Sequence, residues 1–252
     1  MITLMYHDIF SSSLEESGFT FRTAMPYKVE HSTFTAVLKS LNDLHPDILG
    51  RQVEFTFDDG GCSAMDAAEE LESYGLQGIF FIPTEYIGKP GFLTSGQIRE
   101  LHERGHIIGA HSHSHAYDKK TIALEWAKSV KILSDITDAP IKTASVPHGL
   151  VSRNIIRKAA ICGITTLYTT EPTDKFHIRY GVKIKGRFCI HRNDNPATIT
   201  AIILERRVQS ILHIKWKLLS YFRTILGKKY VKFKDILLYR KCTLRHIQQE
   251  KG

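Results

Sequence analysis

Short apolar runs alternate with amphipathic stretches between residues 53 and 168, and this alternation restricts the fold more than any other feature of the chain. Strands are predicted at 53–57, 79–82, 106–110, 142–146 and 165–168. Helices are predicted between them, at 64–74, 95–104, 121–136 and 153–162. Such alternation is typical of a parallel α/β sheet or barrel with right-handed crossovers.

Clusters of histidine, aspartate and other polar residues follow four expected strands. They are Tyr6-His7-Asp8, Asp58-Asp59, His111 to His115 and Pro147-His148-Gly149. Since the carboxyl ends of parallel strands meet at one edge, we expect these clusters to lie together. A carboxylate with two imidazoles is a common ligand set for a catalytic divalent metal. Of two adjacent aspartates, one can bind the metal while the other takes a proton.

Two of the clusters resemble motifs of the polysaccharide deacetylases with a NodB homology domain, also called carbohydrate esterase family 4. Thr56-Phe57-Asp58-Asp59-Gly60 is similar to the first motif of that family, and His111-Ser112-x-x-His115 is similar to the second. The resemblance covers roughly residues 1–195. It implies a distorted (β/α)7 barrel and a hydrolase that removes N-acetyl groups from amino sugars of a polysaccharide, glycolipid or glycan precursor.

The resemblance also implies a role for each motif residue. Asp59, His111 and His115 would bind one divalent metal, for which we expect zinc, with cobalt, nickel or manganese as alternatives. Asp58 would act as general base. The backbone N–H of His148, in a loop similar to the family's Pro-Tyr-Gly loop, would donate to the oxyanion.

The chain departs from the family pattern in two places. The expected Leu-Leu-His-Asp motif is missing near the C-terminus, whereas residues 4–8 have this character, as in the circularly permuted deacetylases of exopolysaccharide export. We therefore assign His7 as general acid, with His191 as its rival. The family's base-orienting arginine aligns with Ser145, so we expect Arg187 to replace it from another strand; a surface or ion-pair arginine is the alternative.

Charge separates the C-terminal part of the chain from the rest. Residues 201–252 carry 13 lysines and arginines against three acids, whereas residues 1–200 carry 21 against 23. We therefore expect a deacetylase domain over 1–200 and a basic amphipathic helical extension over 201–252. The extension suits packing on the barrel or attachment to an anionic membrane. Nucleic acid ranks behind both, because no nucleic-acid module accompanies the charge.

The remaining expectations concern location, partners and competing functions. The sequence shows no basic leader and no run of about 20 apolar residues, which predicts a cytoplasmic protein, peripheral at the inner membrane face. The expected partner is an acetylated amino-sugar glycan or a lipid-linked precursor. An esterase for O-acetyl sugars and a non-catalytic scaffold that binds a membrane or a partner are the alternatives.

Two features near the motifs remain open at this stage. His113 lies between two expected ligands, where it could support a ligand, face solvent or make local contacts only. The segment Ser11 to Gly18 has the composition of a polar surface loop.

Overall fold

The computed structural model describes residues 1–44, 46–116, 121–149 and 151–226. It divides into two compact units, Met1–Gln209 and Ser210–Gly252. The expected domain boundary at residue 200 falls within helix α7 (Pro196–Leu204), which packs against α1 (His31–Leu44) inside the first unit. Among the described residues, no helix combines the length and apolar character needed to cross a bilayer.

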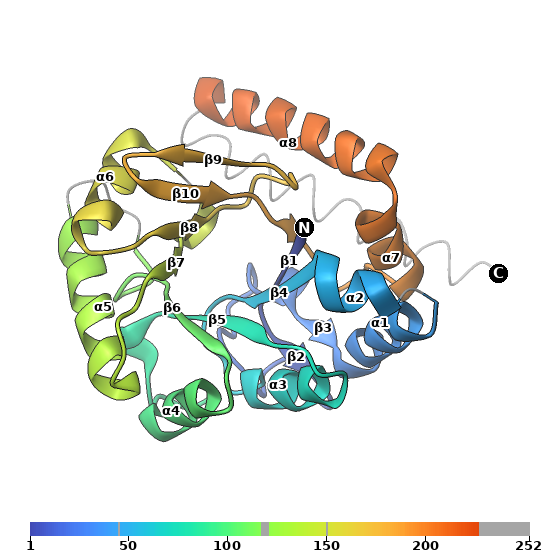
Figure 1. Ribbon diagram of the computed structural model, residues 1–252, viewed down its shortest axis with the longest axis horizontal. Helices are drawn as coiled ribbons and strands as arrows, with labels where there is room; N and C mark the ends of the chain where they lie inside the picture. Colours follow the sequence, from blue (N-terminus) through green and yellow to red (C-terminus); the bar gives the residue numbers. More distant parts are fainter. Residues whose placement is uncertain (45, 117–120, 150, 227–252) are drawn as a thin grey trace. The chain divides into compact units, whose positions relative to one another are not determined.

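A nine-stranded sheet forms the centre of the first unit (Figure 1), in the order β11-β1-β4-β5-β6-β7-β8-β10-β9. The parallel strands are β1 (Ile2–Tyr6), β4 (Val53–Phe57), β5 (Gly78–Ile82), β6 (Ile107–Ala110), β7 (Thr143–Ser145), β8 (Thr166–Tyr168), β10 (Val182–Lys185) and β11 (Phe188–Cys189). The edge strand β9 (Phe176–Arg179) runs antiparallel to β10. A separate parallel pair joins β2 (Ile9–Phe10) to β3 (Val29–Glu30).

Contacts across the concave side show that the sheet curls. Glu54 on β4 accepts a hydrogen bond from the Tyr168 hydroxyl on β8 at 3.0 Å and pairs with Lys185 Nζ on β10 at 2.6 Å. In a flat sheet β4 and β8, four strand spacings apart, would be separated by roughly 19 Å. The sheet is therefore an open, parallel-rich half-barrel, which confirms the predicted distorted α/β barrel.

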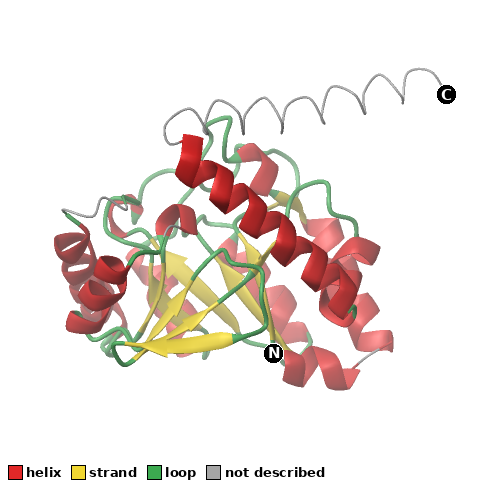
Figure 2. Cartoon of the chain, turned by 90° about the horizontal axis from the view of Figure 1, so that it is seen from above, coloured by secondary structure: helices red, strands yellow, loops and turns green. Residues whose placement is uncertain are grey.

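Helices lie outside the curled sheet (Figures 1 and 2) and follow the strands as predicted. Besides α1 and α7 they are α2 (Pro46–Gln52), α3 (Ala64–Ser73), α4 (Ser95–Glu103), α5 (Ile122–Thr137) and α6 (Arg153–Ile161). Helix α4 begins at a capping box, in which Thr94 Oγ1 accepts from the Gln97 N–H and Gln97 Oε1 accepts from the Thr94 N–H. The four predicted helices are confirmed to within two residues at each end.

The structure differs from the sequence predictions in three places. Helix α1 was not predicted, although Phe34, Val37, Leu38 and Leu41 have helical spacing and are buried. The hairpin of β9 and β10 was also missed, although both strands alternate apolar and polar residues; every residue of β9 is exposed. The segment Ser11 to Gly18 is not wholly a surface loop, since Ser17 is buried and donates a hydrogen bond to the buried Asp8 carboxylate at 2.7 Å.

Candidate active site

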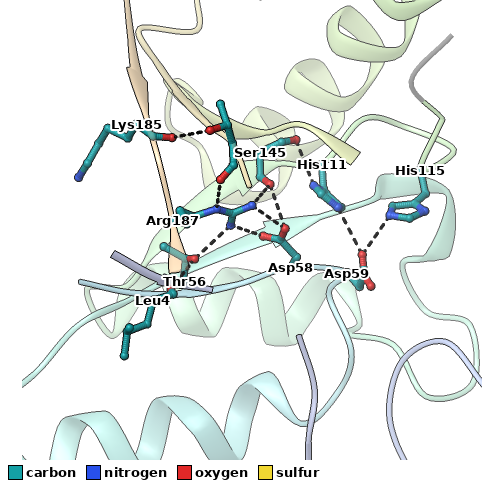
Figure 3. A network of polar contacts seen from close by, with 10 residues as sticks. Leu4, Thr56, Asp58, Asp59, His111, His115, Ser145, Lys185 and Arg187 are labelled. Atoms are coloured by element: carbon teal, nitrogen blue, oxygen red, sulfur yellow. Dashed lines mark hydrogen bonds and ion pairs between the residues drawn. The ribbon is translucent and has the colours of Figure 1, made fainter. Parts of the chain in front are cut away.

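The acidic and histidine clusters meet at the carboxyl ends of β4 and β6 (Figure 3). Asp59 Oδ1 lies 3.3 Å from His111 Nε2 and 3.1 Å from His115 Nε2. One potential ligand atom from each of these three residues lies within 4.8 Å of the ligand atoms of the other two residues. The three predicted ligands therefore converge on a single point, with Asp59 and His111 buried and His115 partly exposed.

The hydrogen bond at the other ring nitrogen of His111 tests whether this triad fits a metal. His111 Nδ1 lies 3.1 Å from the Ser145 carbonyl oxygen. A carbonyl only accepts, so Nδ1 carries a proton, and in the neutral ring the lone pair on Nε2 points toward Asp59. Asp59 Oδ1 is itself buried and accepts no hydrogen bond from the described residues. Two acceptors facing each other repel unless a cation lies between them, and a divalent metal fits this arrangement.

The shifted pKa values of Asp59 and His111 agree with a cation site. Burial raises the pKa of Asp59, but the neighbouring imidazoles of His111, His115 and His7 outweigh burial and hold that pKa well below its ordinary value. For the His111 imidazole, burial acts in the opposite direction and lowers the pKa. The carboxylates of Asp58 and Asp59 outweigh burial and raise that pKa. The site therefore concentrates negative charge where a cation would bind.

Three site residues have left-handed backbone conformations that L-residues rarely adopt. The φ angle is 75° at Asp59, 60° at His115 and 57° at His148. Each such conformation costs on the order of 1–3 kcal/mol and persists only where the surroundings fix it. His148 is exposed, and its ring centroid lies 5.0 Å from that of His115. The loop carrying the expected oxyanion donor thus lies beside the histidine cluster.

One carboxylate that sequence reasoning missed supports the histidine loop. Glu125 Oε2, in the first turn of α5, accepts hydrogen bonds from the backbone N–H groups of His113 and Ser114 at 3.0 and 2.7 Å. The Ser114 hydroxyl donates to the same oxygen at 3.0 Å. His113 Nδ1 pairs with Thr84 Oγ1 at 2.8 Å, so its ring makes local contacts that hold the loop. An acid in the first turn of a helix was the available signal for Glu125.

Asp58 is held by a buried arginine. Arg187 is fully buried and donates from Nη1 to Asp58 Oδ1 at 2.6 Å and from Nη2 to Asp58 Oδ2 at 2.8 Å (Figure 3). Its Nη2 also donates to Ser145 Oγ at 2.7 Å, and that hydroxyl donates to Asp58 Oδ2 at 3.0 Å. Burial raises the pKa of Asp58, but the Arg187 guanidinium outweighs burial and lowers it. Asp58 is therefore an ionised carboxylate of fixed orientation.

Both candidate acids lie against the ring of one tyrosine, Tyr27. The ring centroid of Tyr27 is 4.8 Å from that of His7 and 5.3 Å from that of His191. His7 Nδ1 is buried and has no hydrogen-bond partner among the described residues. Burial lowers the pKa of His7, against the attraction of the nearby Asp59 and Asp58 carboxylates. His191 has a side chain 45% exposed and pairs instead with Asp194 at 3.5 Å.

A buried ion pair fixes the segment that carries Tyr27. Residues 27–30 run beside residues 7–10 in constant register, with Tyr27 on His7 and Lys28 beside Asp8. Lys28 is 1% exposed, its Nζ lies 3.6 Å from Asp8 Oδ2, and it donates to the Ser17 carbonyl. Sequence reasoning missed Lys28 because a lysine is almost always solvent-exposed.

Comparison with known proteins agrees with this site. The sequence profile of the polysaccharide deacetylase family matches residues 47–167 of this chain. YxkH of Bacillus subtilis strain 168, a protein assigned to the polysaccharide deacetylases, is 28% identical over 200 residues, which span 75% of this chain and 69% of YxkH. The chain is thus related to hydrolases of the deacetylase type.

Two solved structures show the same fold. A polysaccharide deacetylase from Bacillus cereus has a TM-score of 0.66 at 19% identity, covering 80% of this chain and 68% of its own. A de-N-acetylase from Aggregatibacter actinomycetemcomitans has a TM-score of 0.64 at 15% identity, covering 80% of this chain and 98% of its own. The half-barrel is therefore of the NodB type.

Proposed function

We propose that this chain is a metal-dependent hydrolase that removes N-acetyl groups from amino sugars of a polysaccharide, glycolipid or glycan precursor. The observation that carries the proposal is the convergence of Asp59, His111 and His115 beside a carboxylate, Asp58, that is kept ionised and oriented by Arg187. Zinc suits a ligand set of two imidazoles and one carboxylate, and cobalt, nickel and manganese are accepted by similar sets.

Each residue of the site has a specific task in this proposal. Asp59, His111 and His115 hold the metal, which when bound polarises the acetyl carbonyl and makes water more acidic. Asp58 takes the proton of the attacking water, a role that requires the ionised carboxylate maintained by Arg187. The backbone N–H of His148 donates to the developing oxyanion, an interaction worth about 3 kcal/mol in other hydrolases.

His7 is the proposed acid that protonates the leaving amine. Because burial lowers its pKa, the ring is neutral in the free enzyme and must first acquire a proton. Asp58, which collects a proton from water, is one of the two carboxylates acting on His7. His191 is the weaker rival, since its electrostatic partners are Cys189 and Asp194 rather than Asp58 or Asp59.

The nature of the leaving group and of the substrate is also part of the proposal. A protein of the same fold is named a de-N-acetylase, which supports an amide rather than an ester substrate. We propose an acetylated amino-sugar glycan or a lipid-linked precursor, met on the cytoplasmic side of the membrane. The relation to circularly permuted deacetylases, suggested by the position of His7, belongs to the same proposal.

Acetate release from N-acetylglucosamine oligomers and lipid-linked precursors tests the activity. The full chain, stripped of metal with a chelator, should release acetate only after addition of Zn²⁺, Co²⁺, Ni²⁺ or Mn²⁺. Asp58→Asn and Asp59→Asn should abolish release, whereas Asp66→Asn, an exposed aspartate on α3, should leave it unchanged. A preparation that binds metal stoichiometrically yet releases no acetate from any such substrate contradicts the proposal.

His7 separates amide from ester hydrolysis. An amine leaves poorly without a proton, whereas an alkoxide leaves more easily, so His7→Ala should lower activity on N-acetyl substrates far more than on O-acetyl ones. Full activity of His7→Ala on an O-acetyl sugar, with no activity of the unaltered chain on N-acetyl sugars, would identify an esterase. Failure to bind any metal, with no effect of Asp59→Asn, would instead indicate a scaffold.

A further inference from the structure

Helix α8 (Arg206–Leu226) has a composition that the proposed reaction does not explain. Its 21 residues include no aspartate or glutamate, and its five cations are Arg206, Arg207, Lys215, Lys217 and Arg223. All residues of the candidate active site lie in the first compact unit, Met1–Gln209. None of the cations of this helix has a role in the proposed reaction.

The apolar residues of α8 form two neighbouring stripes. Val208, Leu212, Trp216 and Leu219 make one stripe at spacings of three and four residues. Ile211, Ile214, Leu218 and Tyr221 make the second. With about 100° of rotation per residue, each stripe spans about 80° of the helix circumference, and Lys215 lies between the two stripes. A helix that packs on a single surface needs an apolar face of only about 100°, so the second stripe is in excess of what packing requires.

The second stripe is exposed. The exposed fractions are 55% for Ile211, 58% for Ile214, 55% for Leu218 and 65% for Tyr221. The first stripe, by contrast, is half-buried throughout. Isolated exposed apolar side chains are ordinary, but four in line along one helix mark an interaction surface.

Two lysines flank this exposed stripe. On a helical projection Lys217 lies about 80° to one side of its centre and Lys215 about 80° to the other. Both are exposed. We propose that α8 binds along the surface of an anionic membrane, with Ile211, Ile214, Leu218 and Tyr221 entering the headgroup region. Lys215 and Lys217 extend alongside to lipid phosphates, in the way that long cationic side chains reach a polar interface.

The apolar stripe favours a membrane over nucleic acid. Binding to a phosphate backbone depends on cations and gains nothing from a row of isoleucine and leucine. A lipid surface uses both, because apolar area and cationic charge contribute separately to binding. The sequence after α8 adds to the attraction, since residues 227–252 hold eight lysines and arginines against two acids.

Vesicle sedimentation of the full chain tests the proposal. The chain should sediment with vesicles of phosphatidylcholine and phosphatidylglycerol, remain soluble with phosphatidylcholine alone, and be released by high salt. Leu218→Glu should lower the partition coefficient at least about tenfold more than the control Ser220→Glu. The control makes the same change of charge about 140° from the centre of the stripe, on the polar side of the helix, and leaves the stripe intact.

A milder pair of variants covers the case in which the glutamates disturb folding. Lys215→Gln/Lys217→Gln should lower binding to anionic vesicles roughly tenfold, with an unchanged circular dichroism spectrum. Equal losses for the stripe variant and its control would overturn the proposal. So would vesicle binding that ignores phosphatidylglycerol, or a gel shift with duplex DNA in the absence of any vesicle binding.

Discussion

Arg187 contacts Asp58 through two hydrogen bonds of 2.6 and 2.8 Å, although 129 positions separate the two residues in the sequence. The sheet brings them together, because β11 pairs with β1 and β1 pairs with β4. Arg187 immediately precedes β11, and Asp58 immediately follows β4. Arg187, just before β11, and Ser145 thus surround the carboxylate that we propose as the base.

Removal of this arginine should affect both stability and catalysis. Arg187→Ala leaves Asp58 as a buried charge without a cationic partner, for which we expect a loss of about 3–5 kcal/mol in the free energy of unfolding. Because Asp58 is proposed to act on water rather than on the sugar, kcat should fall at least about a hundredfold while KM changes little. Urea unfolding and steady-state kinetics measure the two effects.

Arg187→Lys distinguishes charge from geometry in the same site. Lysine keeps the positive charge but cannot make the paired contact of a guanidinium, so an intermediate loss of kcat is expected. Arg153→Ala, at an exposed arginine that begins α6, is the control and should change stability by less than about 0.5 kcal/mol. Wild-type kcat in Arg187→Ala would show that the arginine does not position the base.

Glu125 should control the affinity of the site for metal. Its carboxylate accepts three hydrogen bonds from His113 and Ser114, the residues that precede His115. Glu125→Ala should leave the fold intact but allow the loop to move, and supporting groups of this kind typically contribute 10- to 100-fold, so we expect metal affinity to weaken by about that factor. Calorimetric titration of the metal-free chain with Zn²⁺ measures this change.

Glu103→Ala, an exposed glutamate at the end of α4, is the matched control for that titration. It removes the same carboxylate from another helix and should leave zinc affinity unchanged. If Glu125→Ala binds zinc as tightly as the unaltered chain, the loop does not depend on this carboxylate.

Sequence patterns predicted the local elements and the motif residues, because both depend on short-range order. The strand and helix periodicities between residues 53 and 168 and the Asp58-Asp59 and His111 to His115 clusters are of this kind. The position of Arg187 was an expectation drawn from a family pattern, and the structure alone places it on Asp58.

Contacts between distant segments could not be read from the sequence. Lys28 and Asp8 form a buried pair only because residues 27–30 run beside residues 7–10. No periodic pattern in the sequence predicts that register. The same is true of Glu54, which meets Tyr168 and Lys185 only after the sheet has curled. A charged side chain is assigned to the surface by default, so buried pairs of this kind are missed.

The buried Lys28–Asp8 pair predicts a large asymmetry between single and double variants. Lys28→Met leaves the Asp8 carboxylate buried without its cation, and we expect a loss of about 3–5 kcal/mol in the free energy of unfolding. Asp8→Asn/Lys28→Met removes both charges and should recover part of that loss. Urea unfolding of the two single variants and the double variant gives the coupling energy. Strictly additive losses would show that the pair does not act as a unit.

The lowered pKa of His7 predicts how stability depends on pH. Burial disfavours the charged ring in the folded state, against the pull of Asp59 and Asp58, while the unfolded chain keeps the ordinary pKa of about 6.5. Below that pH the unfolded state therefore binds more protons than the folded state. The free energy of unfolding should fall as the pH decreases from about 6.5 toward the pKa of folded His7.

His7→Gln isolates this contribution, because glutamine is polar and does not titrate. The difference in the free energy of unfolding between about pH 7 and pH 5 should be smaller in His7→Gln than in the unaltered chain, both measured by urea unfolding in the presence of a chelator. His177→Gln, at an exposed histidine on β9, should retain the full difference. Identical pH dependence in His7→Gln and the unaltered chain would mean that the His7 ring accepts a proton as readily in the folded as in the unfolded state. Burial of His7 would then impose no constraint on proton transfer to the leaving amine.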